Sequence, residues 1–246
     1  MVWVESKLVE RRVWAEGLIS VRLDRVLSAF APGQFVNLGL DLGEERVKRS
    51  YSLSSAPGEP SEFYLTLVAG GVLTPALFEL PIGASLWIDD RPLGFFTLEH
   101  VPASRQLWML ATGTGLGPFL AMLRSPQVWE RFARIVLVHG VRQVAHLGYA
   151  EQLAIWARER ASQFSYVPVV SREAAPNGAL AGRLPQLIAS GELERAAGLA
   201  LEPAETHVLL CGNPDMIRDV AEQLEARGMH KHRPRKPGHY SFENYW

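Results

Sequence analysis

The hydrophobic pattern of this 246-residue chain changes near residue 100. Before that point apolar and polar side chains alternate over short segments, as they do in strands with one buried face. Turn residues such as Ala31-Pro32-Gly33 separate these segments, which cover residues 18–23, 34–38, 62–68 and 85–89. Short strands at this spacing predict an antiparallel β-barrel or sandwich, and one short helix fits between Thr74 and Leu80.

After residue 100, short apolar runs replace the alternation, as is typical of strands buried on both faces of a sheet. The runs cover residues 107–111, 135–139, 166–171 and 208–211. Helical patterns cover residues 148–160 and 214–227, and the second begins with a proline that suits a first helical turn. Alternating strands and helices predict a parallel α/β sheet with flanking helices. The polar link 99–105 divides the two predicted domains, 1–101 and 102–246.

Charge and cysteine content exclude several classes of protein. The 25 basic and 26 acidic side chains give a net charge of −1, which removes any global electrostatic basis for binding nucleic acid or a membrane surface. The single cysteine, Cys211, excludes an internal disulfide and a cysteine-based metal cage, and we expect no metal site. The uncharged stretch 106–123 contains glycines and Pro118, which favour a strand, a turn and a helix over a membrane span. Since no secretory signal is evident either, we expect a soluble cytoplasmic protein.

The segment Arg49-Ser50-Tyr51-Ser52 ends a predicted strand. The guanidinium group of Arg49 suits a phosphate, and the ring of Tyr51, two residues later, can lie flat against a ring system. The hydroxyl of Ser52 can then donate to a heteroatom of that ring. An ordinary strand with an exposed arginine is the alternative interpretation.

The segment Gly70-Gly71-Val72-Leu73-Thr74-Pro75 precedes the predicted helix of the first domain. Thr74 is expected to cap that helix and Pro75 to occupy its first turn. Free N–H groups at a helix start can bind a diphosphate, although a plain hairpin leading into a helix would use the same residues.

The segment Thr112-Gly113-Thr114-Gly115-Leu116-Gly117-Pro118 follows the first apolar run of the second domain. A glycine-rich turn at this place is where open α/β sheets bind nucleotides. The spacing differs from the dinucleotide fingerprint G-x-G-x-x-G, and a tight strand–helix turn is the alternative.

Taken in order, the three segments resemble the bacterial ferredoxin/flavodoxin–NADP reductase family. Later segments are similar to that family as well: Val170-Ser171-Arg172-Glu173, Ala181-Gly182-Arg183, Cys211-Gly212-Asn213-Pro214-Asp215-Met216 and the ending Glu243-Asn244-Tyr245-Trp246. The resemblance covers essentially the whole chain. It implies an N-terminal antiparallel β-barrel that holds FAD and a C-terminal α/β domain that holds NADP.

The resemblance also implies a set of FAD contacts. Arg49 would bind the diphosphate, Tyr51 would stack on the isoalloxazine, and Ser52 would lie near flavin N5. The further FAD residues implied are Ser50, Tyr64, Val72, Leu73, Thr74, Thr114, Tyr245 and Trp246. Of these, Tyr64 also fits the core of a strand.

For NADP, the residues implied are Thr114, Val141, Arg142, Ser171, Arg172, Arg183, Asn213, Pro214 and Asp215. The preference for NADP over NAD has a physical basis in the sequence as well. A 2′-phosphate needs arginines on loops at strand ends, and Arg142, Arg172 and Arg183 occupy such places.

The resemblance also implies four residues at the reacting centre: Ser52, Cys211, Glu243 and Tyr245. In the family such a cysteine packs against the nicotinamide, and no base that would make Cys211 a nucleophile is evident beside it. Glu243 would relay protons, or is an exposed tail carboxylate. Tyr245 would cover the flavin face and Trp246 the FAD adenine.

The resemblance implies a flavoprotein oxidoreductase that moves electrons between NADPH and ferredoxin or flavodoxin. The mostly basic run His230–Lys236 would attract such acidic carriers, or is a solvated loop. Two alternatives remain open at this point: an NADPH-dependent flavin reductase that serves an oxygenase or small acceptors, and a nucleotide-binding regulatory module without redox chemistry. We expect a monomer.

Overall fold

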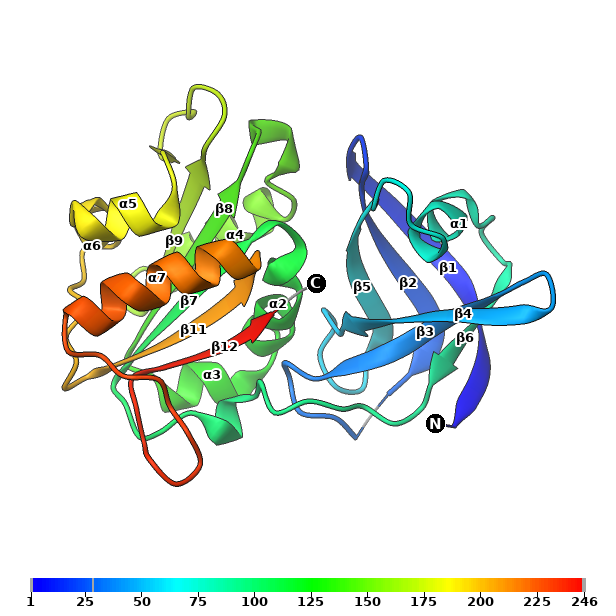
Figure 1. Ribbon diagram of the computed structural model, residues 1–246, viewed down its shortest axis with the longest axis horizontal. Coiled ribbons are helices and arrows are strands. Elements are labelled where there is room, and N and C mark those ends of the chain that lie inside the picture. The colour runs from blue at the N-terminus through cyan, green and yellow to red at the C-terminus, as the bar shows by residue number, and fades with distance from the viewer. Residues whose placement is uncertain (1, 28, 245–246) are drawn as a thin grey trace. The chain divides into compact units, whose positions relative to one another are not determined.

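The computed structural model describes residues 2–27 and 29–244, which form two compact units. One unit contains the described residues up to Leu98 together with Gly117–Pro126. The other contains Glu99–Leu116 and the described residues from Gln127 onward. The first sheet is antiparallel and the second parallel with helices, which confirms the predicted fold class (Figure 1). The assignment of FAD to 1–101 and of NADP to 102–246 stays a prediction.

The first unit is a six-stranded antiparallel sheet that curls into a barrel (Figure 1). The order of its strands is β4-β3-β6-β1-β2-β5. The long strand β1 pairs with β6 and with β2, and its pairing with β2 shifts register beside Glu10 and again after Val13. Such irregularities bend a strand, which lets one strand serve both neighbours in a curved sheet. The strands are β1 (Trp3–Ala15), β2 (Leu18–Val26), β3 (Phe35–Leu42), β4 (Glu45–Ser52), β5 (Pro60–Thr66) and β6 (Ser85–Asp89).

The interior of the barrel comes from the alternating apolar residues of its strands. Leu23, Leu38, Phe63 and Ile88 are completely buried there. Helix α1 (Leu73–Glu79) adds the buried side chains of Leu73 and Leu77 to the unit. The unpredicted 3-10 turn η1 (Leu98–His100) begins at Leu98, where the first stretch of the unit ends, and its other two residues belong to the second unit.

Helix α2 (Gly117–Leu123) belongs to the barrel unit although it follows the first strand of the parallel sheet. All seven of its residues are buried. The ring of Phe119 lies 5.8 Å from that of Phe96, and Met122 lies against Gly33. Gly33 has φ +103° and a side chain there would collide with the carbonyl of Phe96, so this turn requires glycine. The barrel therefore takes part of its core from a distant segment of the chain.

The second unit is built on a six-stranded parallel sheet of order β10-β9-β8-β7-β11-β12. Strands β7, β8 and β11 are buried along almost their whole length, as their continuous apolar runs predict. The strands are β7 (Gln106–Thr112), β8 (Arg134–Val141), β9 (Phe164–Val170), β10 (Leu180–Ala181), β11 (Thr206–Gly212) and β12 (Tyr240–Asn244).

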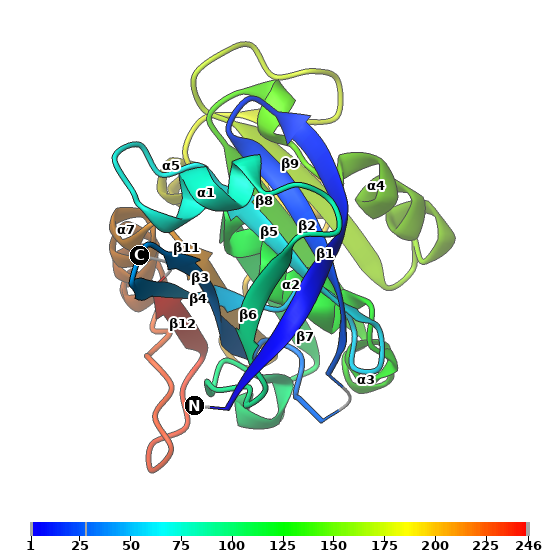
Figure 2. The same cartoon turned by 90° about the vertical axis from the view of Figure 1, so that its right-hand side faces the viewer.

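Helices cover this sheet on both faces. Helices α5 (Leu184–Ala189), α6 (Glu192–Ala197) and α7 (Pro214–Ala226) pack on one face, where Trp108, Leu110 and Val136 lie in the same core. Figure 2 shows α4 (Ala150–Glu159) on the opposite face from α5 and α7. The short helix α3 (Pro126–Arg131) precedes β8, and the 3-10 turn η3 (Val144–His146) follows it.

Helix α7 forms as the sequence predicts. The side-chain oxygen of Asn213 accepts hydrogen bonds from the N–H groups of Asp215 and Met216 at 2.8 and 3.2 Å, which caps the helix start. Met216, Val220 and Leu224 form its buried stripe. Among the residues that the structure describes, no helix is both long and apolar enough to cross a membrane.

Candidate functional site

The carboxyl-terminal edge of the parallel sheet collects most of the residues predicted to bind NADP. Because the strands are parallel, the loops that follow β7, β8, β9 and β11 all leave the sheet at this edge. These loops carry Thr114, Arg142, Ser171, Arg172 and Asn213. Arg183 lies just after β10, at the start of α5.

The glycine turn η2 (Gly113–Leu116) lies directly against the backbone of β11. A Cβ atom on Gly115 would come within 2.5 Å of the carbonyl oxygen of Cys211. Gly212 has φ +133°, and a Cβ atom there would lie 2.2 Å from the hydroxyl of Thr112. That hydroxyl instead accepts a 2.9 Å hydrogen bond from the N–H of Asn213. The glycines are thus needed for backbone-to-backbone contact between two loops of the site.

A histidine for which the sequence predicted no role supports the same turn. His139, on β8, is completely buried, and its Nε2 lies 3.1 Å from the carbonyl oxygen of Gly113. Burial lowers the pKa of His139 to about 4, so the ring is neutral at physiological pH and donates from Nε2. The sequence feature that could have indicated this role is the presence of a polar residue, His139, at the end of the apolar run 135–139.

The three predicted NADP arginines follow neighbouring strands and are exposed. Within residues 2–27 and 29–244 none of the three forms an ion pair. Backbone bonds hold two of their loops together: Ser171 N–H donates to the carbonyl of Val141, and Arg172 N–H to that of Arg142, at 3.0 and 2.9 Å. The hydroxyl of Ser171 also donates a hydrogen bond to the carbonyl of Val141, at 3.1 Å. The nearby carboxylate of Glu173 accepts from the N–H of Val144. This edge therefore presents the positive charge of three arginines that form no ion pair with a carboxylate of the described residues.

Cys211 and Glu243 lie opposite each other in the β11–β12 ladder. Burial raises the pKa of the Cys211 thiol well above its usual range, and the carboxylate of Glu243 raises it further. The thiol is therefore protonated at neutral pH, which favours a packing role over a nucleophilic one. Pro214 and Asp215 begin α7, where Asp215 pairs with Arg218 at 2.8 Å.

In the barrel, the predicted FAD segment forms the last part of β4. Arg49 is exposed and donates to the carbonyl of Lys48 at 2.7 Å, and no carboxylate of the described residues pairs with it. Ser50 donates to the side-chain oxygen of Asn37 at 2.9 Å. Tyr51 is half-buried, and burial raises its pKa to about 12, which keeps the phenol protonated. Ser52 is buried at the end of the strand.

The start of α1 differs from its sequence prediction. Thr74 lies inside the helix and its hydroxyl accepts a 3.0 Å hydrogen bond from the N–H of Val68, so the prediction that Thr74 caps the helix is wrong. Val72 occupies the cap position, is 56% exposed, and makes no side-chain capping bond. Leu73 packs into the core. The first N–H groups of the helix lack intrahelical partners, as at any helix start, and so remain suited to a phosphate.

Three further predicted residues have different outcomes. Tyr64 is buried on β5 and meets Trp14 edge-on at 6.5 Å. Its neighbours Phe63 and Leu65 pack in the barrel core, so Tyr64 faces the other side of the sheet and its FAD contact stays a prediction. Tyr245 and Trp246 lie outside the described residues. The structure does place the preceding residue: Asn244 pairs with Gly212 at the carboxyl-terminal edge of the sheet.

The basic run His230–Lys236 lies at the opposite edge of this sheet. It precedes β12, at the amino-terminal end of the strands, and forms part of the loop between α7 and β12 (Figure 1). Arg233 and Lys236 close its turn with two backbone hydrogen bonds of 3.0 and 2.9 Å. Lys231, Arg233, Arg235 and Lys236 are all exposed.

Fold and site together define an oxidoreductase of the class that combines a β-barrel with a nucleotide-binding α/β domain. Residues 109–222 match the family model of the oxidoreductase NAD-binding domain. The flavodoxin/ferredoxin–NADP reductase of Shigella flexneri is 42% identical over 246 residues, with 99% of each chain covered. The ferredoxin–NADP reductase of Azotobacter vinelandii is 35% identical over 242 residues, or 94% of this chain and 92% of that one. The chain belongs to the flavodoxin/ferredoxin–NADP reductase family.

A solved structure agrees with this assignment. The crystal structure of a ferredoxin NADP+ reductase from Neisseria gonorrhoeae with bound FAD and NADP is similar with a TM-score of 0.94 and 32% sequence identity, covering 99% of both chains. The resemblance that the sequence motifs indicated is thereby confirmed. The roles of the individual residues stay predictions.

Replacing Gly115 with alanine should loosen the contact between the glycine turn and β11, because the new Cβ would lie 2.5 Å from the Cys211 carbonyl oxygen. We expect the free energy of unfolding to fall by about 1–3 kcal/mol, measured by urea denaturation. Gly113→Asn is the matched control: nothing lies within 4 Å of a Cβ there, and asparagine tolerates a φ of +54°. Equal losses for the two variants would contradict the close-contact explanation.

The free energy of unfolding should decrease as the pH falls from about 6.5 toward 4. Over this window the unfolded chain, in which His139 titrates near its ordinary pKa of 6.5, binds a proton that the folded protein excludes down to a pKa of about 4. The slope contributed is at most about 1.4 kcal/mol per pH unit. His139→Gln should reduce the slope by up to this amount, and the remaining slope should include the contribution of buried His207, whose pKa is lowered to about 3. An unaltered slope in His139→Gln would refute the assignment.

Proposed function

We propose that this protein is an FAD-dependent reductase that moves electrons between NADPH and a one-electron carrier, ferredoxin or flavodoxin. Its full-length relatives are named flavodoxin/ferredoxin–NADP reductases, and the similar crystal structure contains FAD and NADP. The observation that carries the proposal is the row of three exposed arginines at the carboxyl-terminal edge of the parallel sheet, none of which pairs with a carboxylate of the described residues. That edge suits the 2′-phosphate that distinguishes NADP from NAD.

The barrel residues fit FAD. When bound, FAD accepts two electrons as a hydride and releases them one at a time. Arg49 has a guanidinium group that no described carboxylate neutralises, so it is available for a diphosphate. The N–H groups at the start of α1, beside Val72, Leu73 and Thr74, would hold the same diphosphate. Tyr51 would stack on the isoalloxazine, and Ser52 would orient it by a hydrogen bond.

The residues at the sheet edge fit NADP. Arg142, Arg172 and Arg183, with Ser171 between them in the sequence, would bind the 2′-phosphate, and Thr114 and Val141 would line the nucleotide path. Asn213, Pro214 and Asp215 would flank it from the last loop. Cys211, protonated and buried, would pack near the nicotinamide with Glu243 beside it. Tyr245 and Trp246 would cover the flavin and the adenine of FAD.

The basic run His230–Lys236 would act on acidic carriers by attraction over a distance. It lies at the amino-terminal edge of the sheet, opposite to the nucleotide residues, which argues against its forming the electron-transfer contact itself. Exposed charges such as Lys231, Arg233, Arg235 and Lys236 raise association rates without direct contact and lose this effect in high salt. We also propose that the chain acts as a monomer in the cytoplasm, where its single thiol would stay reduced.

The visible spectrum of the purified protein tests the proposal first. We expect the absorption bands of oxidised flavin, which NADPH should bleach in a stopped-flow experiment much faster than NADH does. A colourless protein that takes up no added FAD would refute the flavoprotein function. A preference for NADH would refute the NADP assignment alone.

Changing any of the three arginines to glutamine should raise the KM for NADPH about ten- to hundredfold, because each charged contact to phosphate contributes roughly 1.5–3 kcal/mol. The KM for NADH should change little, since NADH lacks the 2′-phosphate. Arg158→Gln is the matched control, because Arg158 is exposed at the end of α4, which leads into the start of β9 and not to the carboxyl ends of the strands. Parallel losses with both nucleotides would indicate general damage and contradict the specific role.

A further inference from the structure

The barrel closes where the predicted FAD segment leaves its strand. Strands β4 and β5 are the two edges of the antiparallel sheet, so neither edge has a ladder partner beyond it. After Ser52 the chain makes one last bond toward β3, from Leu53 N–H to the Gln34 carbonyl at 3.1 Å. The next residue crosses to the other edge, because Ser54 N–H donates to the Glu62 carbonyl on β5 at 2.8 Å. We call this pair, Ser54 and Glu62, the barrel seam.

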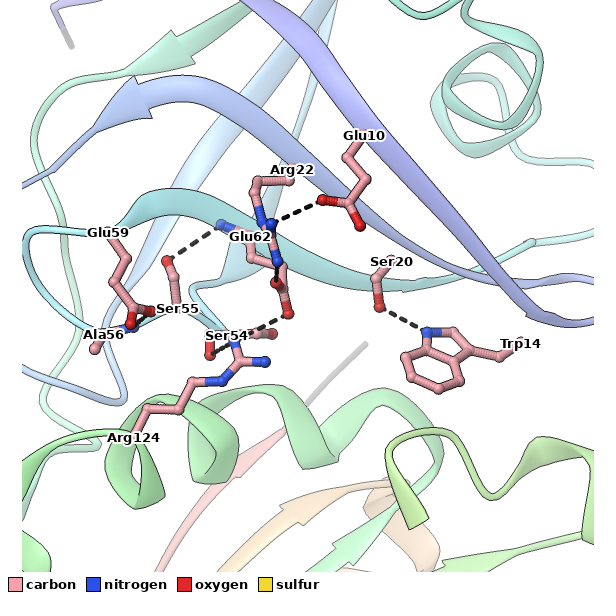
Figure 3. Close-up of polar contacts among 10 residues, drawn as sticks. All are labelled: Glu10, Trp14, Ser20, Arg22, Ser54, Ser55, Ala56, Glu59, Glu62 and Arg124. Carbon is pink, nitrogen blue, oxygen red and sulfur yellow. Dashed lines mark hydrogen bonds and ion pairs between the residues drawn. The ribbon is translucent and has the colours of Figure 1, made fainter. Parts of the chain in front are cut away.

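A single arginine binds both residues of the seam. Arg124 follows the last residue of α2, and its Nη1 donates to the carbonyl of Ser54 at 2.7 Å and to the carboxylate of Glu62 at 3.0 Å (Figure 3). The side chain of Arg124 is 19% exposed and that of Glu62 only 6%. In this surrounding, screening by water is weak, so the two hydrogen bonds are strong.

A second arginine holds the same carboxylate from the neighbouring strand. Arg22 on β2 donates to Glu62 at 2.9 Å and to Glu10 at 2.7 Å, and its side chain is 41% exposed (Figure 3). Arg22 thus shares with Arg124 the task of compensating the buried charge of Glu62. The two arginines differ in the bonds that the structure shows for them. Arg22 binds carboxylates, whereas Arg124 also donates to the backbone of the seam, at the carbonyl of Ser54.

We propose that Arg124 is a positioning residue for FAD, a role that rests on the proposed function. By fixing the carbonyl of Ser54, Arg124 fixes the backbone two residues after Ser52 and three after Tyr51. Other contacts restrain the same short stretch: Glu62 N–H donates to the Ser55 hydroxyl at 3.2 Å, and Ala56 N–H to the Glu59 carboxylate at 3.0 Å. Among these contacts, the bond from Arg124 connects residues 54–56 to the end of α2, whose buried residues are part of the barrel core.

The test compares Arg124→Gln with Arg22→Gln. Each variant removes one arginine from Glu62, so both should lower the melting temperature of the apoprotein. The affinity for FAD, measured by quenching of flavin fluorescence on binding, should fall about tenfold in Arg124→Gln, as for loss of a charged hydrogen bond, and less than about twofold in Arg22→Gln. The rate of flavin reduction by saturating NADPH should follow the same order.

A double variant separates positioning from stability. Glu62→Gln combined with Arg124→Gln removes both buried charges, so it should recover melting temperature relative to Arg124→Gln alone, yet keep the weakened FAD binding. Equal FAD affinities of Arg124→Gln and Arg22→Gln, or recovery of affinity together with stability in the double variant, would overturn the proposal. If the unmodified protein binds no FAD, the proposed function fails instead, so the two failures are distinguishable.

Discussion

The carboxyl-terminal edge of the parallel sheet depends on one contact, the approach of the glycine turn to the backbone of β11. With no side chain between them, Gly115 lies against the Cys211 carbonyl and Gly212 against Thr112. This contact sets where Thr114 and Asn213 lie relative to each other. It also explains why His139 is buried beneath the turn: its ring supplies the hydrogen bond that the carbonyl of Gly113 would otherwise lack.

Arginine serves two opposite purposes in the two units. In the barrel, Arg22 and Arg124 are matched by the carboxylate of Glu62, and the result is a fixed backbone. At the sheet edge, Arg142, Arg172 and Arg183 have no such match among the described residues, and the result is a local positive potential. The net charge of −1 conceals this division, since it averages over both uses. The arrangement of carboxylates decides which arginines are held in ion pairs and which present their charge at the sheet edge.

The sequence predicted the parts of the structure that repeat with a regular period. Both sheets, α7 and the arginine loops followed from alternation, apolar runs and strand ends. Strand β1 was missed because its many charged residues, such as Glu10 and Arg12, obscure the alternation, and β12 because its five residues follow a basic loop. Contacts between distant residues left no local signal: His139 and Gly113 are 26 positions apart, and Arg124 and Glu62 are 62 apart. Thr74 was misplaced because Ser and Thr bind backbone N–H groups in turns as readily as at caps.

The membership of α2 in the barrel has a consequence for how this protein can be divided. Its seven buried residues lie in sequence between two strands of the other unit, so no single cut separates the barrel with its complete interior. A fragment that ends at Leu98 would expose the apolar surface around Phe96 and Gly33 and leave Glu62 without one of its two arginines. The barrel unit is therefore made of two stretches of sequence, and recombination between relatives would have to exchange both stretches at once.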